Sequence, residues 1–213
     1  LHFTWYGHSS VLIEMEGKRI LVDPMFGEAA APVPFFSPRF PLEKPIPWQE
    51  IKNIDAVIIS HDHYDHLDYG SILELKDQVG HFYTALGVGE HLKRRGVDPE
   101  RITELDWWSE VKFQGITFVC TPARHFSGRS LTDRNKSLWA SWVIKGLDHR
   151  LFFSGDSGYA NHFVEIGEKY GPFDLAFIEC GQYNVRWEAV HMMPEQSVMA
   201  AKDLNANFMM PIH

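Results

Sequence analysis

The stretch SHDHYDHLD, residues 60–68, places three histidines and three aspartates in nine positions directly after the apolar run DAVIIS. Imidazoles and carboxylates are costly to bury unless each has a partner, so packing alone does not explain them. In an extended segment alternate side chains share a face, so His61 and His63 point the same way and could share one metal cation. Asp65 and His66 break that alternation, and a tight turn would direct them toward a second cation. The alternatives are a solvated charged loop and a histidine-rich tract.

Further metal-binding side chains are expected at the ends of other strands, because six residues cannot fill two coordination spheres. His125 follows VCTPAR, Asp156 follows LFFSG and His213 follows FMMPI. A single histidine at a strand end is most often a structural residue. The recurrence at three strand ends favours a shared site, and hydrolytic sites with two metals hold them about 3.5–4 Å apart.

The composition restricts the class of protein. The chain has 213 residues, enough for one large domain or two small ones, and its 20 basic and 28 acidic residues give a net charge of −8. This balance provides no basic surface for nucleic acid or an anionic membrane. We find no transmembrane run and no signal peptide, and we expect a soluble, cytoplasmic protein. Cys120 and Cys180 each end an apolar run, as buried thiols do.

Short strands alternate with single helices along the chain, which favours an α+β or layered sandwich over a doubly wound sheet. The first three strands resemble an antiparallel meander. The expected strands are residues 3–7, 10–15, 19–24, 55–60, 81–86, 111–113, 116–123, 139–146, 150–156, 174–180 and 208–212. The expected helices are residues 69–77, 87–96, 161–170 and a segment after Pro194.

A proline-rich segment follows the meander. Residues 24–48 carry seven prolines together with aromatic residues, which excludes a regular helix or a central strand. We expect residues 32–48 to form an ordered loop or an apolar lid, because linkers seldom carry so many aromatics. The alternative is a solvated linker.

Taken in order, the motifs resemble the metallo-β-lactamase fold superfamily. The most similar branch contains N-acylphosphatidylethanolamine-hydrolysing phospholipase D and ascorbate-6-phosphate lactonase-like proteins. The motifs that carry this resemblance are GHSSVLIE, LVDP, IDAVIISHDHYDHLD, TPARHFSGR, DRNKSLWASW, FFSGDSGY and HMMPEQ. The resemblance implies an α/β (α+β) fold, a four-layer αββα sandwich, in which residues 1–213 form a single domain. We expect that domain to be truncated at both ends.

The resemblance also implies a set of ligands for two metal ions. His61, His63 and His125 would hold the first ion, and Asp65, His66 and His213 the second, with Asp156 bridging. This set, with one hydroxide and two divalent ions, has a formal charge of +1, which favours a phosphate or a developing oxyanion. His191 would donate to the substrate or protonate its leaving group, so His191, Asp65 and Asp156 are the expected catalytic residues.

Other residues are expected around this centre. Asp23 and His8 match short motifs of the branch. They would contact the metal ligands from outside the coordination sphere and fix their orientation, although a purely structural role is favoured for His8. Arg129 and Arg134 are candidates for contacts with an anionic substrate, and an ordinary surface role is equally favoured. Met193 stands where relatives carry a residue that can cap the following helix, and methionine cannot do so.

We expect a binuclear, metal-dependent hydrolase that uses a hydroxide bridging the two ions. Zinc is preferred because the ligands are nitrogen and oxygen atoms rich in histidine, and Mn, Fe or Ni remain compatible. The expected substrate is a small-molecule or lipid-like ester, most of all a phosphodiester or phospholipid. A lactonase or sugar-phosphate hydrolase is the alternative, and a metal-binding module without turnover is a third hypothesis. The sequence does not indicate the oligomeric state.

Overall fold

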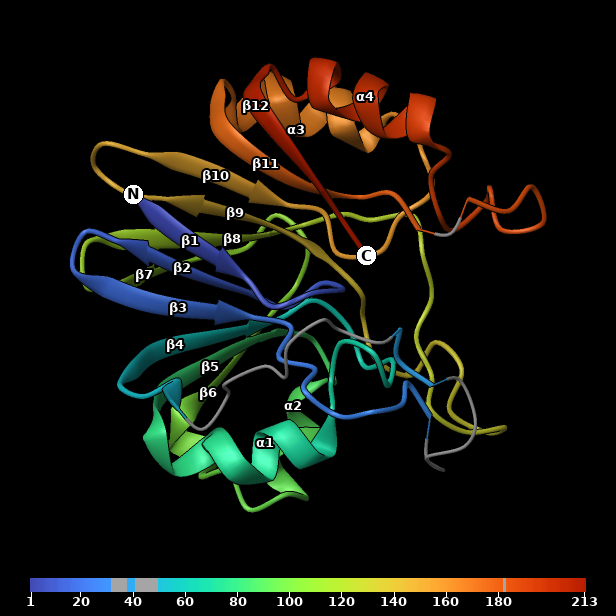
Figure 1. Cartoon of the computed structure of the whole chain (residues 1–213). Coiled ribbons are helices and arrows are strands. Elements are labelled where there is room, and N and C mark those ends of the chain that lie inside the picture. Colours follow the sequence, from blue (N-terminus) through green and yellow to red (C-terminus); the bar gives the residue numbers. More distant parts are fainter. Residues whose placement is uncertain (32–37, 41–49, 182) are drawn as a thin grey trace. The chain divides into compact units, whose positions relative to one another are not determined.

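The computed structural model describes residues 1–31, 38–40, 50–181 and 183–213. These residues form two compact units, each built around one six-stranded sheet (Figure 1). Unit 1 comprises residues 1–104 and 127–137, and unit 2 comprises residues 105–126 and 138–213. The predicted lid, residues 32–48, lies outside the described residues except for 38–40.

The sheet of unit 1 follows the order of its strands along the chain, from β1 to β6. Its strands are β1 (His2–Trp5), β2 (Val11–Met15), β3 (Lys18–Val22), β4 (Ile54–Ile59), β5 (Val79–Ala85) and β6 (Ile102–Leu105). β1, β2 and β3 pair antiparallel, so the predicted meander is confirmed. β3, β4 and β5 pair parallel, and β4 is buried along almost its whole length, as expected for a central parallel strand.

Two short helices lie on one face of this sheet (Figure 1). They are α1 (Tyr69–Leu75), which continues into the 3₁₀ turn η2 (Lys76–Gln78), and α2 (Gly89–Lys93). The Asp68 side chain caps α1 by accepting hydrogen bonds from the backbone N–H groups of Gly70 and Ser71. The predicted helix 69–77 is therefore present, with its last turn tightened to 3₁₀. A second 3₁₀ turn, η3 (Pro99–Arg101), leads into β6, a strand that the sequence pattern did not predict.

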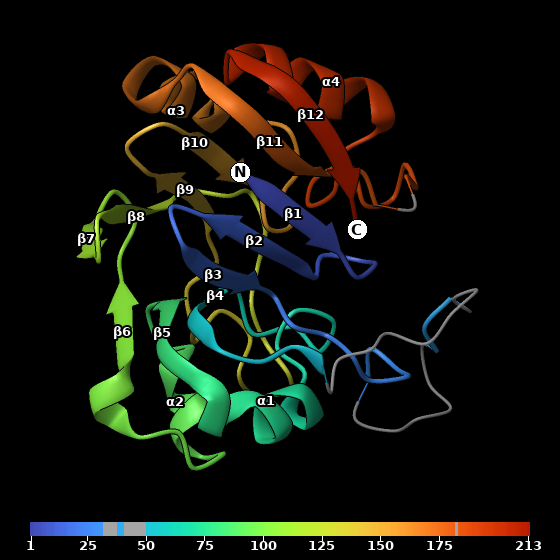
Figure 2. The same ribbon diagram turned by 60° about the vertical axis from the view of Figure 1, so that its left-hand side comes forward.

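The sheet of unit 2 has the strand order β12-β11-β10-β9-β8-β7. Its strands are β7 (Glu110–Phe113), β8 (Ile116–Thr121), β9 (Ser141–Lys145), β10 (Arg150–Phe153), β11 (Phe173–Glu179) and β12 (Ala206–Ile212). β7 to β10 pair antiparallel, whereas β10, β11 and β12 run in the same direction (Figure 2). Both sheets are therefore mixed, which agrees with the predicted α+β pattern and not with a doubly wound sheet.

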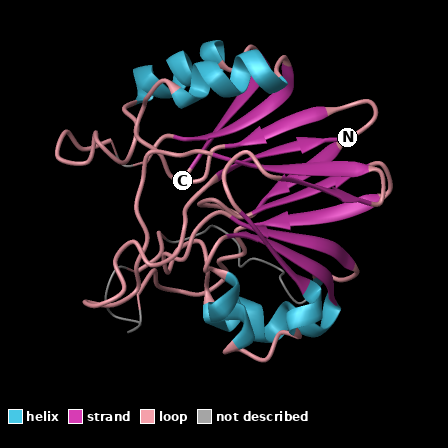
Figure 3. Cartoon of the chain, turned by 180° about the vertical axis from the view of Figure 1, so that it is seen from behind, coloured by secondary structure: helices cyan, strands magenta, loops and turns pink. Residues whose placement is uncertain are grey.

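Helices α3 (His162–Tyr170) and α4 (Pro194–Asp203) lie side by side against the sheet of unit 2 (Figure 3). Phe152, Phe163 and Phe173 are fully buried between them and the strands. The helices approach closely at Gly167, where an added Cβ would lie 2.0 Å from the Asp203 carbonyl oxygen. α4 begins without a capping side chain at Met193, as expected, and the Gln196 side chain instead accepts the Met193 N–H at 2.9 Å.

Parallel strands determine where polar side chains gather, because the carboxyl ends of parallel neighbours meet at the same edge of a sheet. Asp23 and the histidine motif follow the neighbouring strands β3 and β4 in unit 1. Asp156, Glu179 and His213 lie at or just after the ends of β10, β11 and β12 in unit 2. Each unit thus brings polar side chains to one edge of its own sheet.

His162 gives unit 2 a predictable response to acid. The ring is buried beside Ser157, and burial, with a smaller contribution from the charge of Arg124, lowers its pKa to about 4. Between pH 6.5 and 4 the unfolded chain therefore binds a proton that the folded chain excludes, and stability falls as the pH falls. We expect a loss of roughly 3 kcal/mol over this range in the metal-free chain, measured by urea unfolding. The His162→Gln variant should lack this component, and equal pH profiles for the two chains would contradict the prediction.

Candidate metal centre

The histidine motif of unit 1 forms a turn at the carboxyl end of β4. The carbonyl of His63 accepts the N–H groups of His66 and Leu67 at 3.1 and 2.9 Å, which closes the predicted tight turn. His61 and His63 do lie together, with Nε2 of His61 3.0 Å from Nδ1 of His63. The turn therefore gathers imidazole nitrogens in one place, as the residue spacing predicts.

Asp23 fixes two of these histidines. Its fully buried carboxylate accepts hydrogen bonds from the Ser60 N–H at 2.7 Å, the Ser60 hydroxyl at 2.6 Å and Nδ1 of His66 at 2.7 Å. Because the Ser60 hydroxyl donates to Asp23, its oxygen accepts from Nδ1 of His61 at 2.9 Å. Both rings thus carry their hydrogen on Nδ1, which leaves Nε2 in the form that binds a metal. Asp23 also adopts a positive φ of 41°, a strained conformation for a non-glycine residue.

Asp65 and His8 form a second contact in unit 1. Nε2 of His8 lies 3.0 Å from Oδ2 of Asp65, and Nε2 of His66 lies 3.9 Å from the same oxygen. His8 has a positive φ of 50° in the turn between β1 and β2. The structure therefore places His8 against an expected metal ligand, where its ring can orient the carboxylate.

Asp62 points away from its histidine neighbours, as the alternation predicts, and anchors the segment 127–137. Its carboxylate accepts from the Gly128 N–H and the Ser137 hydroxyl, both at 2.8 Å, and lies 3.4 Å from Nε2 of His91. Burial alone would raise the pKa of Asp62, but these hydrogen bonds outweigh it and the pKa is lowered. The sequence pattern did not reveal this network, because Gly128 and Ser137 are 66 and 75 residues away from Asp62 and His91 lies on α2.

Arg129 lies in this network. Its guanidinium donates to the carbonyls of Asp62 and Leu67 at 2.6 and 2.7 Å and stacks over the rings of Tyr64 and Tyr69. Through these contacts the Arg129 side chain stabilises the backbone of the histidine motif. The predicted contact of Arg129 with an anionic substrate stays a prediction. Arg134 lies in the same segment, with its backbone against Gly128.

In unit 2 three imidazoles approach one carboxylate oxygen. Oδ2 of Asp156 lies 3.2 Å from Nε2 of His213, 3.7 Å from Nε2 of His125 and 4.0 Å from Nδ1 of His191. The side chains of Asp156 and His125 are almost completely buried. Asp156, His191 and His213 each offer an atom within 4.8 Å of the others, a spacing that could hold a metal ion.

The backbone orients His125 for such a role. Its Nδ1 donates to the Val190 carbonyl at 3.0 Å, so Nε2, the nitrogen nearest Asp156, keeps its lone pair. The His191 ring stacks with His213 and meets His125 edge to face, with centroids 5.1 and 5.2 Å apart. Tyr183, Val185 and Trp187, which follow β11 in the chain, are exposed, and the Trp187 ring lies 6.3 Å from that of His191.

Glu179 is a residue of this edge that the sequence analysis missed. It is fully buried at the end of β11, 3.6 Å from Nδ1 of His191. Burial raises the pKa of its carboxyl, the His191 contact opposes that effect, and the charge of Asp156 adds to it. The signal was present, because Glu179 lies near the end of the apolar run DLAFIEC and Asp156 and His213 follow similar runs.

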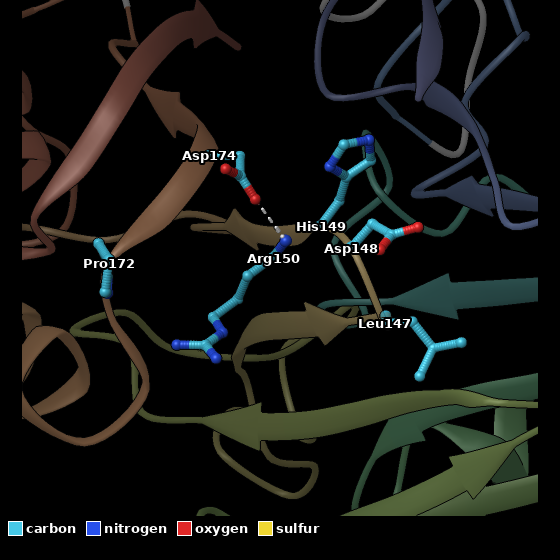
Figure 4. A pocket seen from close by; sticks show the side chains of 7 residues that line it. Leu147, Asp148, His149, Arg150, Pro172 and Asp174 are labelled. Atoms are coloured by element: carbon cyan, nitrogen blue, oxygen red, sulfur yellow. Dashed lines mark hydrogen bonds between the residues drawn. The ribbon is translucent and has the colours of Figure 1, made fainter.

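A separate hollow of about 180 Å³ in unit 2 contains none of these residues. It lies at the turn between β9 and β10 and is lined by residues 146–150, Pro172 and Asp174 (Figure 4). The Arg150 N–H donates to Asp174 at 2.8 Å, and the guanidinium donates to the carbonyls of Tyr170 and Gly171. This hollow is at the amino end of β10, whereas Asp156 follows its carboxyl end.

The donors in each unit fit divalent metal ions. All are imidazole nitrogens or carboxylate oxygens, and His61, His66 and His125 each use Nδ1 in a hydrogen bond that leaves Nε2 for a metal. Such donors suit zinc and other first-row metals.

Comparison with known proteins identifies the family. The profile of the beta-lactamase superfamily domain matches residues 18–213. The chain belongs to this superfamily, and the predicted metallo-β-lactamase fold is confirmed.

The chain is also similar to individual proteins and solved structures. An uncharacterized protein of Mycobacterium tuberculosis is 43% identical over 217 residues, which cover 100% of this chain and 58% of the relative. The N-acyl-phosphatidylethanolamine-hydrolyzing phospholipase D 1 of Caenorhabditis elegans is 35% identical over 226 residues, 100% of this chain and 63% of its own length. A solved metallo hydrolase from Ignicoccus hospitalis has a TM-score of 0.74 and 23% identity, over 99% of this chain and 81% of the other.

The chain therefore spans about three fifths of the length of these curated relatives, 58% and 63%. Among the described residues no helix is long and apolar enough to cross a membrane. The cytoplasmic location stays a prediction, as does the single-domain organisation.

Replacing Asp23 should loosen the motif of unit 1. We expect Asp23→Ala to lower the affinity for added zinc about 10- to 100-fold and the unfolding free energy by about 3 kcal/mol, because the His66 ring and the Ser60 N–H lose a buried acceptor. Competition with a chelating dye and urea unfolding measure the two effects. Asp77→Ala, at an exposed aspartate of η2, is the matched control. Unchanged zinc affinity in Asp23→Ala would show that Asp23 does not orient a metal ligand.

Proposed function

We propose that the chain binds two divalent metal ions through His61, His63, His125, Asp65, His66, His213 and Asp156. The observation that carries this proposal is the hydrogen bonding of three of these rings within their own unit. Nδ1 of His61 donates to Ser60, Nδ1 of His66 to Asp23 and Nδ1 of His125 to the Val190 carbonyl. Nε2 of His66 then faces Asp65 at 3.9 Å, and Nε2 of His125 faces Asp156 at 3.7 Å, an arrangement that a histidine buried only for structural reasons does not need. Zinc is the proposed ion.

We propose further that the protein is a metal-dependent hydrolase. When bound, such ions lower the pKa of water and polarise the bond to be cleaved, each worth several kcal/mol in the transition state. Asp65 and Asp156 would orient the attacking water, and His191 would hydrogen-bond the substrate or protonate its leaving group. The family and the naming of several relatives as hydrolases support this reading.

For the substrate we propose a phosphodiester or phospholipid-like ester. The support is the relative in Caenorhabditis elegans, whose name states hydrolysis of N-acyl-phosphatidylethanolamine, together with a similarly named relative in Saccharomyces cerevisiae that is 32% identical over 220 residues. Two divalent cations among these ligands would leave a net positive centre, which favours a phosphate group. A lactonase would need a small polar pocket where residues 32–48 would otherwise form an apolar lid, and most of these residues lie outside the described part of the chain.

Loss of a single ligand should abolish activity. We expect His61→Ala and Asp156→Ala to lower kcat/KM for bis-p-nitrophenyl phosphate by about 10²- to 10³-fold or more and to reduce metal content, because each removes one of the proposed metal ligands. Elemental analysis and initial rates measure both. His2→Ala, at an exposed histidine, is the control and should change neither quantity.

A panel of phosphodiesters, lactones and thioesters tests the substrate class on the same preparations. Preference for a lactone would contradict the phosphodiester proposal. Full metal content with no turnover on any member would instead favour the metal-binding module without catalysis.

A further inference from the structure

Glu179 is a buried carboxylate with an unusual set of contacts. Its Oε1 accepts the Met192 N–H at 2.8 Å and faces the Ser157 N–H at 3.4 Å. These two donors directly follow His191 and Asp156 in the chain. One side chain thus links the loop that carries the bridging aspartate to the loop that carries His191.

The backbone of Glu179 is also fixed. Its N–H donates to the Ser154 hydroxyl and its carbonyl accepts from the Ser197 hydroxyl, both at 2.9 Å. The backbone of Glu179 is therefore held by the residue that follows β10 and by the first turn of α4. A side chain carried on a backbone fixed in this way can determine the position of the group that contacts its carboxylate.

The same oxygen, Oε1, also faces His191. Nδ1 of His191 lies 3.6 Å from Oε1. Within the described part of the chain, Nδ1 of His191 and Oε2 of Glu179 have no hydrogen-bond partner. Burying a carboxylate with one oxygen unsatisfied is costly, so a structural role in the core would be better served by an apolar residue. Gly181 closes the loop over the pair at a φ of 51°, where an added Cβ would lie 3.3 Å from Oε2 and 3.5 Å from Cβ of His191.

We propose that Glu179 is a positioning residue for His191. The carboxylate accepts the Nδ1 hydrogen of His191, which fixes the tautomer and the rotation of the ring. Since the two nitrogens lie on opposite sides of the ring, this directs Nε2 away from Glu179 as the atom that exchanges a hydrogen bond or proton with the substrate. A shift of a few tenths of an ångström brings the pair to hydrogen-bond length, and such contacts often tighten only when the substrate is bound. This inference rests on the proposed role of His191.

The test combines two replacements of Glu179 with removal of His191. Glu179→Gln keeps an acceptor of the same shape, and Glu179→Met keeps the volume without an acceptor. We expect Glu179→Met to lower kcat about 10- to 100-fold with KM changed less than about twofold, and Glu179→Gln to restore most of the loss, at constant metal content. Glu168→Ala, at an exposed glutamate of α3, is the matched control.

Each replacement is then repeated in the His191→Ala background, where it should cost nothing further, because Glu179 acts through the missing ring. An equal loss in both backgrounds, or a Glu179→Gln variant as impaired as Glu179→Met, overturns the proposal. If Glu179→Met does not fold, the double-mutant cycle of Glu179→Gln with His191→Ala decides. The smaller loss of kcat in Glu179→Gln should also vanish in the His191→Ala background.

A second measurement is independent of turnover. Long-range ¹H–¹⁵N correlation spectra of the metal-loaded chain should show His191 hydrogenated at Nδ1. Glu179→Met should change that tautomer population, and Glu179→Gln should largely preserve it. An unchanged tautomer in Glu179→Met contradicts the inference. If the natural chain hydrolyses no ester of the panel but this spectral dependence is present, the proposed function fails while the positioning of His191 by Glu179 stands.

Discussion

The candidate centre depends on one constraint: charged and imidazole groups at the ends of buried strands must each find a partner within the protein. Asp23 shows how unit 1 meets it, since one carboxylate satisfies the Ser60 N–H, the Ser60 hydroxyl and the His66 ring. The desolvation cost of so many polar groups is offset only when the network is complete. The same completeness fixes the tautomers of the rings, so the stability of the unit and the chemistry of its histidines have a common origin.

Both units achieve this placement with the same arrangement of strands. Each sheet has antiparallel pairs on one side and a parallel set on the other, β3 to β5 in unit 1 and β10 to β12 in unit 2. Only the parallel set brings the carboxyl ends of adjacent strands together, and the candidate ligands follow these strands or, for His125, the antiparallel strand β8. A buried carboxylate then lies behind the histidines in each unit, Asp23 in one and Glu179 in the other.

The sequence predicted the parts of this scheme that depend on local pattern. Apolar runs located eleven strands, and the residues after them located the candidate ligands, because strand periodicity and strand ends can be recognised in a short window. It missed β6, whose residues Ile102–Leu105 are only half-buried and carry no clear alternation. It also predicted a helix over residues 87–96, whereas α2 spans only Gly89–Lys93. The basic residues and Gly96 mark where the turns after the helix end, and not the last helical residue.

Tertiary partners were the part that the sequence could not supply. Asp62 bonds with Gly128 and Ser137, and Arg129 stacks on two tyrosines of the histidine segment, across separations that no local window includes. Glu179 was missed for the same reason, because its partners Ser157 and Met192 are 22 and 13 residues away along the chain. In a chain whose other strand ends carry aspartate or histidine, a fully buried carboxylate in the same position has the same physical requirement for partners. The Met192 and Ser157 N–H groups supply two of them, and Nδ1 of His191 lies 3.6 Å away as a third.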